Sequence, residues 1–167
     1  MEPNAIRTLA DEYFEYLAET KPTEAHMRGD YRYAHRWEDF SREAEDANVA
    51  KLREFGARAY AIDPSGLSTD DALTREVLIF ETETTAALEE MHLAEFAVDP
   101  IFGFQVYAKL LPPLVSIPTA EVAAAMVEKY KAYGRSFDQM TDRYRQGIVS
   151  GHTPPAFAVD GVIAQLD

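Results

Sequence analysis

The chain has 167 residues, of which 47% are hydrophobic and 27% are charged, a composition typical of one folded domain. It has no cysteine, which excludes a disulfide framework, a thiolate zinc site and a cysteine nucleophile. The formal net charge of −13 repels a phosphate backbone, so nucleic acid is not an expected partner. No apolar run approaches the roughly 20 residues that span a bilayer, and the N-terminus lacks a signal-peptide pattern. We therefore expect a cytoplasmic protein with no membrane contact.

Apolar residues recur at steps of three and four along the first part of the chain, which is the period of an α-helix. This pattern predicts helices over residues 4–19 and 42–62, with a short helical turn and an irregular excursion between them. The second helix must end near Asp63-Pro64, because proline disfavours helical geometry in the residue before it. Ser68 and Asp71 then form a variant of the capping box that starts a further helix.

Two longer helices follow, and both carry apolar residues at alternating steps of four and three. The first seam predicts that its helix packs at a shallow angle against a partner helix. The second predicts one continuous helix over residues 120–149, and its aromatic stripe is interpreted as core packing. A last apolar helix is expected after Thr153-Pro154. The first seam contains Leu73, Val77, Phe80, Thr84, Ala87 and Met91; the second contains Met126, Tyr130, Tyr133, Phe137, Met140, Tyr144 and Ile148; the last helix contains Phe157, Val159, Val162, Ile163 and Leu166.

No run alternates with a period of two for long enough to form a strand, and no internal repeat occurs. The sequence therefore predicts an all-α fold, an elongated helical bundle with two long heptad-patterned helices. We expect residues 1–167 to form a single helical domain that is the N-terminal part of a longer protein.

The connector between the two long helices, residues 93–118, is broken by proline and glycine and is nevertheless rich in aromatic and aliphatic side chains. An apolar connector needs something to cover it. Its segment from Asp99 to Tyr107 either folds over the core of this domain or packs against protein that lies outside this chain, and the sequence leaves both alternatives open. In either case we expect exposed apolar surface around residues 102–114, and hence self-association. The residues expected to face a cleft or a partner are Asp99, Phe102, Phe104 and Tyr107.

None of the four histidines is followed by glutamate, so the chain has no His-Glu pair of the kind that zinc hydrolases use. Glu89 and His92 have the Glu-x-x-His spacing of metal-binding helical bundles, but such bundles need a second copy of the motif and further carboxylates. A helix-terminal histidine without a metal is the better interpretation. Glu24 with His26, and His35 with Glu38, are read as ordinary surface pairs. No catalytic or metal-binding residue is assigned.

Several segments, taken in order, resemble the N-terminal part of the bacterial domain-of-unknown-function family 885 (DUF885). They are Ala10-Asp11-Glu12-Tyr13; Pro22-Thr23-Glu24-Ala25 with Gly29; Ile62-Asp63-Pro64 with Leu67-Ser68 and the helix from Asp70 to Leu78; the connector from Asp99 to Gly103 with Pro112-Pro113; the helix through Tyr130 and Phe137; and Gly147 to Gly151 with Thr153-Pro154-Pro155. The resemblance covers nearly the whole chain, and the order of the segments is more specific than any one of them.

Members of that family look like all-helical, metal-dependent peptidases or related hydrolases. The resemblance implies a protein of several hundred residues in which a later histidine–glutamate motif binds zinc. No position of this chain matches that motif, so zinc is implied for the full-length family and no cofactor for this chain. We expect the chain to be an inert helical scaffold whose partner is the C-terminal half of the same protein, or a second copy. The alternative is a stand-alone helical interaction or dimerisation module without enzymatic activity.

Overall fold

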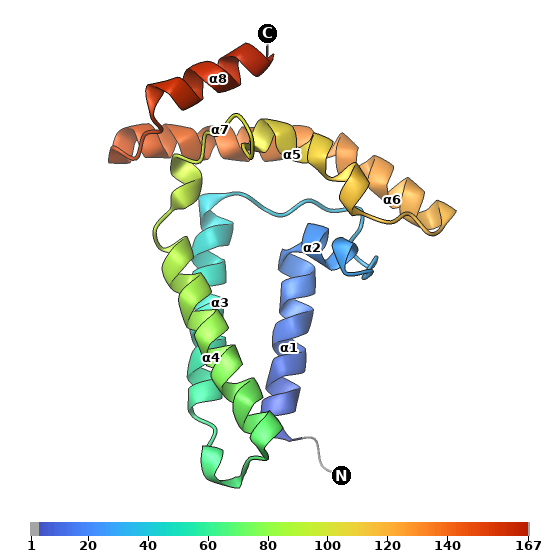
Figure 1. The fold of residues 1–167 in the computed structure, drawn as a ribbon, viewed down its shortest axis with the longest axis vertical. Coiled ribbons are helices and arrows are strands. Elements are labelled where there is room, and N and C mark those ends of the chain that lie inside the picture. Colours follow the sequence, from blue (N-terminus) through green and yellow to red (C-terminus); the bar gives the residue numbers. More distant parts are fainter. Residues whose placement is uncertain (1–3, 167) are drawn as a thin grey trace. The chain divides into compact units, whose positions relative to one another are not determined.

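The computed structural model describes residues 4–166, except for the side chains of Ala108 and Leu166. No strand occurs within these residues, so the predicted all-α class is confirmed (Figure 1). None of the helices found there combines the length and the apolar content that a bilayer crossing requires. The helices are α1 (Ala5–Thr20), α2 (Pro22–Met27), α3 (Arg42–Tyr60), α4 (Thr69–Glu89), α5 (Phe104–Leu110), α6 (Ala120–Lys131), α7 (Tyr133–Ser150) and α8 (Ala156–Leu166), with short 3-10 helices η1 (Pro64–Gly66), η2 (Leu93–Glu95) and η3 (Pro112–Leu114).

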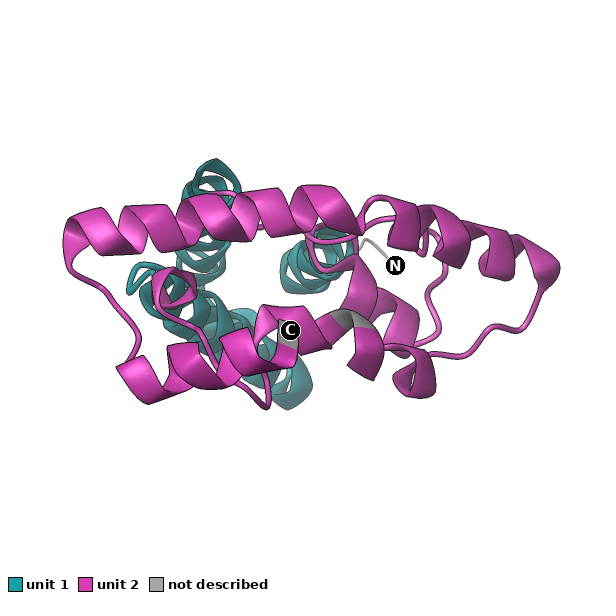
Figure 2. Cartoon of the chain, turned by 90° about the horizontal axis from the view of Figure 1, so that it is seen from above, with its two compact units in different colours: residues 1–17, 42–92 teal, residues 18–41, 93–167 magenta. Residues whose placement is uncertain are grey.

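The chain packs as two compact units, coloured separately in Figure 2. Unit 1 contains residues 1–17 and 42–92, and unit 2 contains residues 18–41 and 93–167. Each unit has an apolar core of its own. That residues 1–167 form one domain of a longer protein stays a prediction.

Unit 1 consists of most of α1 together with α3 and α4, and its helices begin and end close to the predicted positions. The core is apolar and is made by Ile6, Leu9, Phe55, Ala59 and Leu78. The rings of Tyr13 and Phe55 meet edge to face with their centroids 5.4 Å apart. A Cβ atom at Gly56 would lie 2.8 Å from Oγ1 of Thr82, so glycine at this position allows α3 and α4 to approach closely.

The start of α4 has the predicted cap. Oγ of Ser68 accepts a hydrogen bond from the backbone N–H of Asp71 at 3.2 Å. The Asp71 carboxylate accepts hydrogen bonds from Nε of Arg7 (2.7 Å), from the Ser68 hydroxyl (2.7 Å) and from the Asn4 amide (2.8 Å). These donors, Arg7 first, hold the pKa of Asp71 below its usual value. The same contacts join the beginning of α1 to the beginning of α4.

The face of α4 that was predicted to contact a partner helix is instead exposed. Leu73, Val77, Phe80 and Met91 are 63%, 50%, 65% and 58% exposed. The helix does pack beside α3, as the seam led us to expect (Figure 1). The face that it buries is the opposite one. That buried face carries Asp71, Arg75, Leu78, Thr82 and Ala86. The predicted helical period was correct, but the prediction of which face is buried was wrong. Small and hydrogen-bonded residues on the buried face allow closer contact with α3.

In unit 2, the helix predicted over residues 120–149 is interrupted at Ala132 and forms α6 and α7. In a continuous helix the carbonyl of Lys129 would accept the N–H of Tyr133. Here the indole Nε1 of Trp37 donates to that carbonyl at 2.5 Å, and the N–H of Ala132 also reaches it at 3.2 Å. A side chain that enters the hydrogen-bond ladder in this way kinks a helix. The prediction of one unbroken helix was therefore wrong.

The C-terminal part of α7 packs closely against η2 at Gly147. A Cβ atom at Gly147 would lie 2.5 Å from the backbone oxygen of Glu95 and 2.6 Å from that of His152. The Glu95 carboxylate is buried, accepts a hydrogen bond from the Ser150 hydroxyl at 3.1 Å, and lies 4.0 Å from the buried guanidinium of Arg143. Close backbone contact and a buried ion pair therefore hold this part of unit 2 together.

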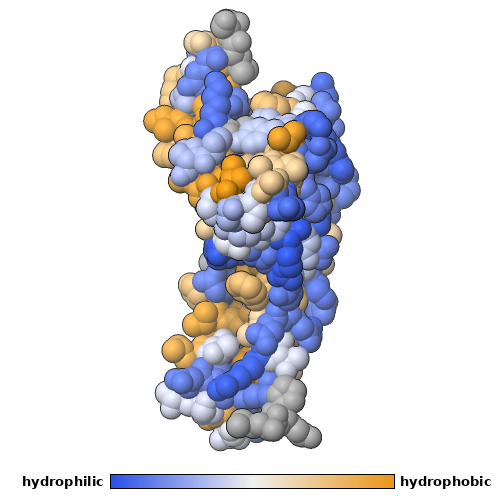
Figure 3. Space-filling view, turned by 90° about the vertical axis from the view of Figure 1, so that its right-hand side faces the viewer, coloured by the Kyte–Doolittle hydropathy of each residue, from blue (hydrophilic) through white to orange (hydrophobic). Residues whose placement is uncertain are grey.

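The last helix forms where it was predicted, but much of its apolar face is exposed. Phe157 and Ile163 face solvent, and Ala158 is the buried residue of α8. Leu166 lies outside the described side chains. Apolar patches interrupt the mostly hydrophilic surface on the face drawn in Figure 3.

Candidate functional site

The four residues predicted from the connector fall into two pairs. Asp99 lies in the exposed loop before α5, where Oδ1 accepts the N–H groups of Ile101 (2.6 Å) and Phe102 (2.7 Å). These bonds lower the pKa of Asp99 from its usual value. The side chain of Phe102 is 81% exposed. Phe104 and Tyr107 belong to α5 and pack into unit 2. The structure therefore brings Phe104 and Tyr107 together, and it leaves Asp99 and Phe102 in the loop.

Phe104 and Tyr107 join an aromatic cluster around Trp37. The ring centroid of Trp37 lies 4.7 Å from that of Tyr133 and 5.8 Å from those of Tyr107 and Tyr130. Phe104 contacts Tyr133 at 5.1 Å, and the Tyr133 hydroxyl donates to the backbone oxygen of Phe104 at 2.6 Å. Part of the connector thus covers the core of its own unit. Other apolar side chains of the segment stay exposed, as was predicted for residues 102–114: Phe102, Leu110 and Leu114.

A buried polar cluster lies directly beside these rings. Nζ of Lys129 donates to Oγ1 of Thr23 at 2.6 Å and lies 4.5 Å from the centroid of the Trp37 ring. Thr23 in turn donates its hydroxyl and its backbone N–H to the two oxygens of Glu38, each at 2.9 Å. Lys129 has no exposed surface, and Thr23 is 1% exposed. A chain of hydrogen bonds therefore links a buried amine to a partly buried carboxylate.

The environment shifts the protonation of two members of this cluster. Burial lowers the pKa of Lys129 from 10.5 to about 8, and the negative charge of Glu38 opposes part of that shift. Burial, followed by the charge of Glu38, raises the pKa of the Tyr107 hydroxyl from 10.0 to about 12, against the effect of a hydrogen bond with Thr23. At neutral pH the cluster therefore holds a charged ammonium group and a neutral phenol.

His26 lies one helical turn after Thr23 and is 1% exposed. Its Nε2 bonds to the backbone oxygen of Ser116 at 2.9 Å, and because a carbonyl only accepts, Nε2 carries the proton. Nδ1 is buried without a hydrogen-bond partner among the described residues. His26 thus anchors α2 to the connector, and the expected surface pair with Glu24 does not form: Glu24 pairs with Arg28 instead, at 3.5 Å. Glu38 likewise binds Thr23 in place of His35.

The chemistry available at Lys129 is limited by access. A lysine amine bonded to a hydroxyl is a combination that some hydrolases use as base and nucleophile. Both groups are buried in this unit, so a substrate carbonyl has no path to Oγ1 of Thr23. The ammonium group is instead satisfied by the Thr23 oxygen and by the face of the Trp37 ring. In the described state this cluster is a packing element and offers no reactive centre.

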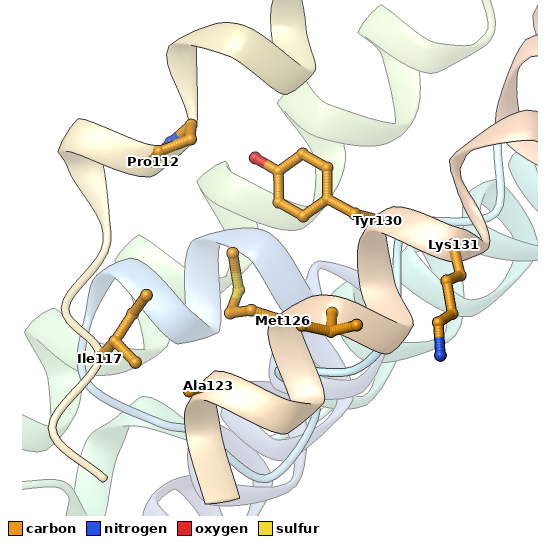
Figure 4. A pocket seen from close by; sticks show the side chains of 7 residues that line it. Pro112, Ile117, Ala123, Met126, Tyr130 and Lys131 are labelled. Atoms are coloured by element: carbon orange, nitrogen blue, oxygen red, sulfur yellow. The ribbon is translucent and has the colours of Figure 1, made fainter. Parts of the chain in front are cut away.

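An apolar pocket of about 590 Å³ opens beside the aromatic cluster (Figure 4). Met126 and Tyr130 line it and also contact the Trp37 cluster, so the two features share a wall. Lys131 is the charged residue of the lining and forms an ion pair with Glu128 at 2.7 Å. The full lining consists of Pro112, Ile117, Ala123, Met126, Val127, Tyr130 and Lys131.

Within residues 4–166, one group of three side chains has the spacing of a possible metal site: Glu45, Asp46 and His92 of unit 1. Nδ1 of His92 bonds to Glu45 at 3.0 Å, and Nη2 of Arg42 lies 2.7 Å from Nε2 of the same ring. Nε of Arg42 also binds Asp46 at 3.0 Å. The guanidinium group of Arg42 therefore already contacts Asp46 and His92, and a zinc ion bound by these residues would have to displace it. The amide nitrogen of Asn48 donates to both carboxylate oxygens of Glu89 at 2.7 Å. Glu89 and His92 therefore have separate partners and do not form a metal site together.

Trp37 and Lys129 were not among the residues predicted from the sequence to form a site. One signal was available, because Lys129 occupies a helical position between Met126 and Tyr133, on the face assigned to the core. A lysine there predicts either a buried partner or an interruption of the apolar stripe. No pattern in the sequence indicated that Trp37, about 90 positions away, supplies the contact.

The family described as "Bacterial protein of unknown function (DUF885)" matches residues 22–167 of this chain. The match covers most of the sequence, and it includes residues 22–41 and 93–167 of unit 2. No significant match was found among curated proteins or among solved structures.

Proposed function

We propose that this chain, which belongs to the DUF885 family of bacterial proteins of unknown function, acts as the helical scaffold of a larger hydrolase-like protein. The reactive centre of that protein, including any zinc site, lies outside residues 4–166. The scaffold contributes rigid helices and does not itself activate water or a nucleophile.

The observation that carries this proposal is the position of Arg42. Its guanidinium group contacts the only imidazole in the candidate ligand group of residues 4–166 and also binds the neighbouring carboxylate of Asp46. A divalent cation at that place would face a fixed positive charge, and His92 would first have to leave Arg42. The closed cluster around Lys129 adds support, because its amine and hydroxyl are buried against each other.

The direct test is to titrate zinc into the full chain by calorimetry and to assay the same sample for turnover of peptide substrates. We expect no stoichiometric zinc uptake and no hydrolysis above the rate of buffer alone. The matched variant is Arg42→Ala, which removes the competing guanidinium group. Single-site zinc binding by the wild-type chain that is lost in His92→Ala, or turnover by the isolated chain, would overturn the proposal.

A second candidate function is a stand-alone interaction module, and the exposed apolar face of α4 supports it. The two functions differ in the length of the natural reading frame. A frame that closes at Asp167 favours the module, and a frame that continues into a His-Glu motif favours the scaffold.

A further inference from the structure

The outer stripe of α4 is the most regular exposed apolar feature of unit 1. We define it as Leu73, Val77, Phe80, Thr84 and Ala87 of α4, at alternating steps of four and three, together with Met91, which follows two residues after the end of the helix. At 100° per residue the five helical positions lie on one line along α4, opposite the face that packs in unit 1. Its large side chains are at least half exposed. A seam of this kind is what a helix presents to another helix.

Carboxylates border the stripe on both sides. Glu76, Glu83 and Glu90 lie along one edge, Asp70 and Glu81 lie along the other, and all five are exposed. Arginine partly offsets two of them, because Arg75 pairs with Glu76, and Arg53 pairs with Glu90 at 2.9 Å. Arg75 is the one basic residue of α4, and it is turned inward, donating to the carbonyls of Tyr60 and Ile62. The stripe is therefore an apolar seam with acidic edges.

We propose that the outer stripe binds an amphipathic helix whose apolar heptad positions pack on Val77 and Phe80 and whose flanking positions carry lysine or arginine. This inference goes beyond the proposed scaffold role by naming the class of partner that binds α4. The apolar contact supplies most of the affinity, and the opposite charges at the edges set the partner and the register.

The acidic edges also argue against a second copy of α4 as the partner. In a parallel pair, Glu76 of one helix would face Glu81 of the other, five positions further along. In an antiparallel pair, each glutamate edge would meet the same edge of its partner. Like charges across a helix pair are unfavourable in either arrangement, and this selects a basic partner.

The binding test uses the full chain and two designed peptides of three heptads each. Both peptides have leucine at the two core positions of each heptad; one has lysine at the flanking positions, and the other has glutamate. By calorimetry we expect the lysine peptide to bind at least tenfold more tightly than the glutamate peptide, and added salt to weaken it. Equal affinity for the two peptides would overturn the inference.

A pair of variants separates docking on the stripe from general attraction to an acidic protein. Phe80→Glu places a charge in the stripe, and Phe157→Glu places the same charge on the exposed face of α8. Both variants make the chain more negative, so a purely electrostatic peptide would bind each of them at least as tightly as the wild type. We expect affinity to fall at least tenfold for Phe80→Glu alone, with both variants retaining the wild-type circular dichroism spectrum.

Three results would contradict the proposal. They are unchanged binding by Phe80→Glu, an equal loss in Phe157→Glu, and a wild-type dimer in sedimentation that Phe80→Glu converts to monomer, which would make a second copy the occupant. Each of these outcomes leaves the scaffold role standing, because that role depends on zinc uptake and turnover. Conversely, zinc-dependent turnover with normal peptide binding would overturn the scaffold role alone.

Discussion

The two units of this protein each depart from a simple oil-drop arrangement, and the main exception differs between them. Unit 1 leaves the heptad seam of α4 in solvent and buries Asp71, Arg75 and Thr82 on the other side of that helix. Unit 2 packs the aromatic residues Tyr107, Tyr130 and Tyr133 of three helices around Trp37 and buries Lys129 beside them. Both units bury charges and expose apolar side chains, but the regular exposed seam belongs to unit 1, and the lysine enclosed by aromatic rings belongs to unit 2.

The difference shows that each exception has its own physical reason. The buried lysine is stable because one hydroxyl and one aromatic ring satisfy its ammonium group. The exposed seam has no such compensation within α4, because a regular apolar line gains free energy only when something covers it. Burial of a charge therefore depends on a hydrogen-bond network inside the unit, and the uncovered seam is the basis of the partner helix that we propose.

The largest effect on the free energy of unfolding is expected when a buried residue of α4 is compared with an exposed one. Leu78 is buried in the core of unit 1, so Leu78→Ala should lower the free energy of unfolding by about 2–5 kcal/mol. Phe80 is two residues away and exposed, so Phe80→Ala should change it by less than about 0.5 kcal/mol. Urea denaturation followed by circular dichroism measures both. Comparable losses in the two variants would mean that the outer stripe is buried in solution.

In unit 2, Gly147→Ala should destabilise by roughly 1–3 kcal/mol, because its new methyl group meets two backbone oxygens that cannot rotate away. Trp37 is the only tryptophan of the chain, so its fluorescence reports the unfolding of unit 2. The matched control is Gly134→Ala, also in α7, where nothing lies within 4 Å of the added atom. That variant should gain about 0.5–1 kcal/mol from helix propensity. Stabilisation in both variants would contradict the packing of α7 on η2.

The cap of α4 gives a smaller, local effect. Ser68→Ala removes the oxygen that accepts the N–H of Asp71 and should cost about 1 kcal/mol. Thr119→Ala is the corresponding change in unit 2, where Oγ1 of Thr119 accepts the N–H of Val122 at a longer 3.3 Å. We expect Thr119→Ala to shift the unfolding transition measured by Trp37 fluorescence more than the one measured by circular dichroism. For Ser68→Ala we expect the larger shift in the circular dichroism transition. Identical shifts in both signals would show that the two units unfold as one.

The smallest effect is a pH dependence from Lys129. Its folded pKa of about 8 lies below the unfolded 10.5, so the cost of burying the charge is complete below pH 8 and falls as the pH rises toward 10.5. Between pH 7 and 9.5, wild-type stability should increase relative to Lys129→Met by an amount on the order of 1 kcal/mol. Because the folded pKa of Tyr107 is raised to about 12, this residue lowers the stability of the folded state as the pH rises, but only above pH 10. Parallel pH profiles for the two proteins would mean that the amine is not buried in solution.

Much of the local structure followed from the sequence. The boundaries of α1, α3 and α4, the short α2 after Pro22, and the Ser68 cap all depend on residues within a few positions of each other. Phe104 and Tyr107 were expected to face a cleft or a partner, and in the structure they pack onto the aromatic core of their own unit. That arrangement is one of the two alternatives that the sequence left open for this segment.

The features that escaped prediction depend on contacts between distant positions. The break at Ala132 requires the Trp37 indole at the Lys129 carbonyl, and Thr23 reaches the same lysine from 106 positions away. The pairing of His92 with Arg42 spans 50 positions and could not be read from the spacing of Glu89 and His92. No local period carries this information.

The sequence by itself determined that these residues are helical and where most of their helices begin and end, because propensity, capping and proline act within one or two turns. Only the tertiary structure decided which face of α4 is buried, where the helix after Thr119 breaks, and how a buried lysine is satisfied. Those outcomes depend on which side chains from distant parts of the chain pack against each face of a helix. The helical period is the same whichever face is buried, so it does not contain this information.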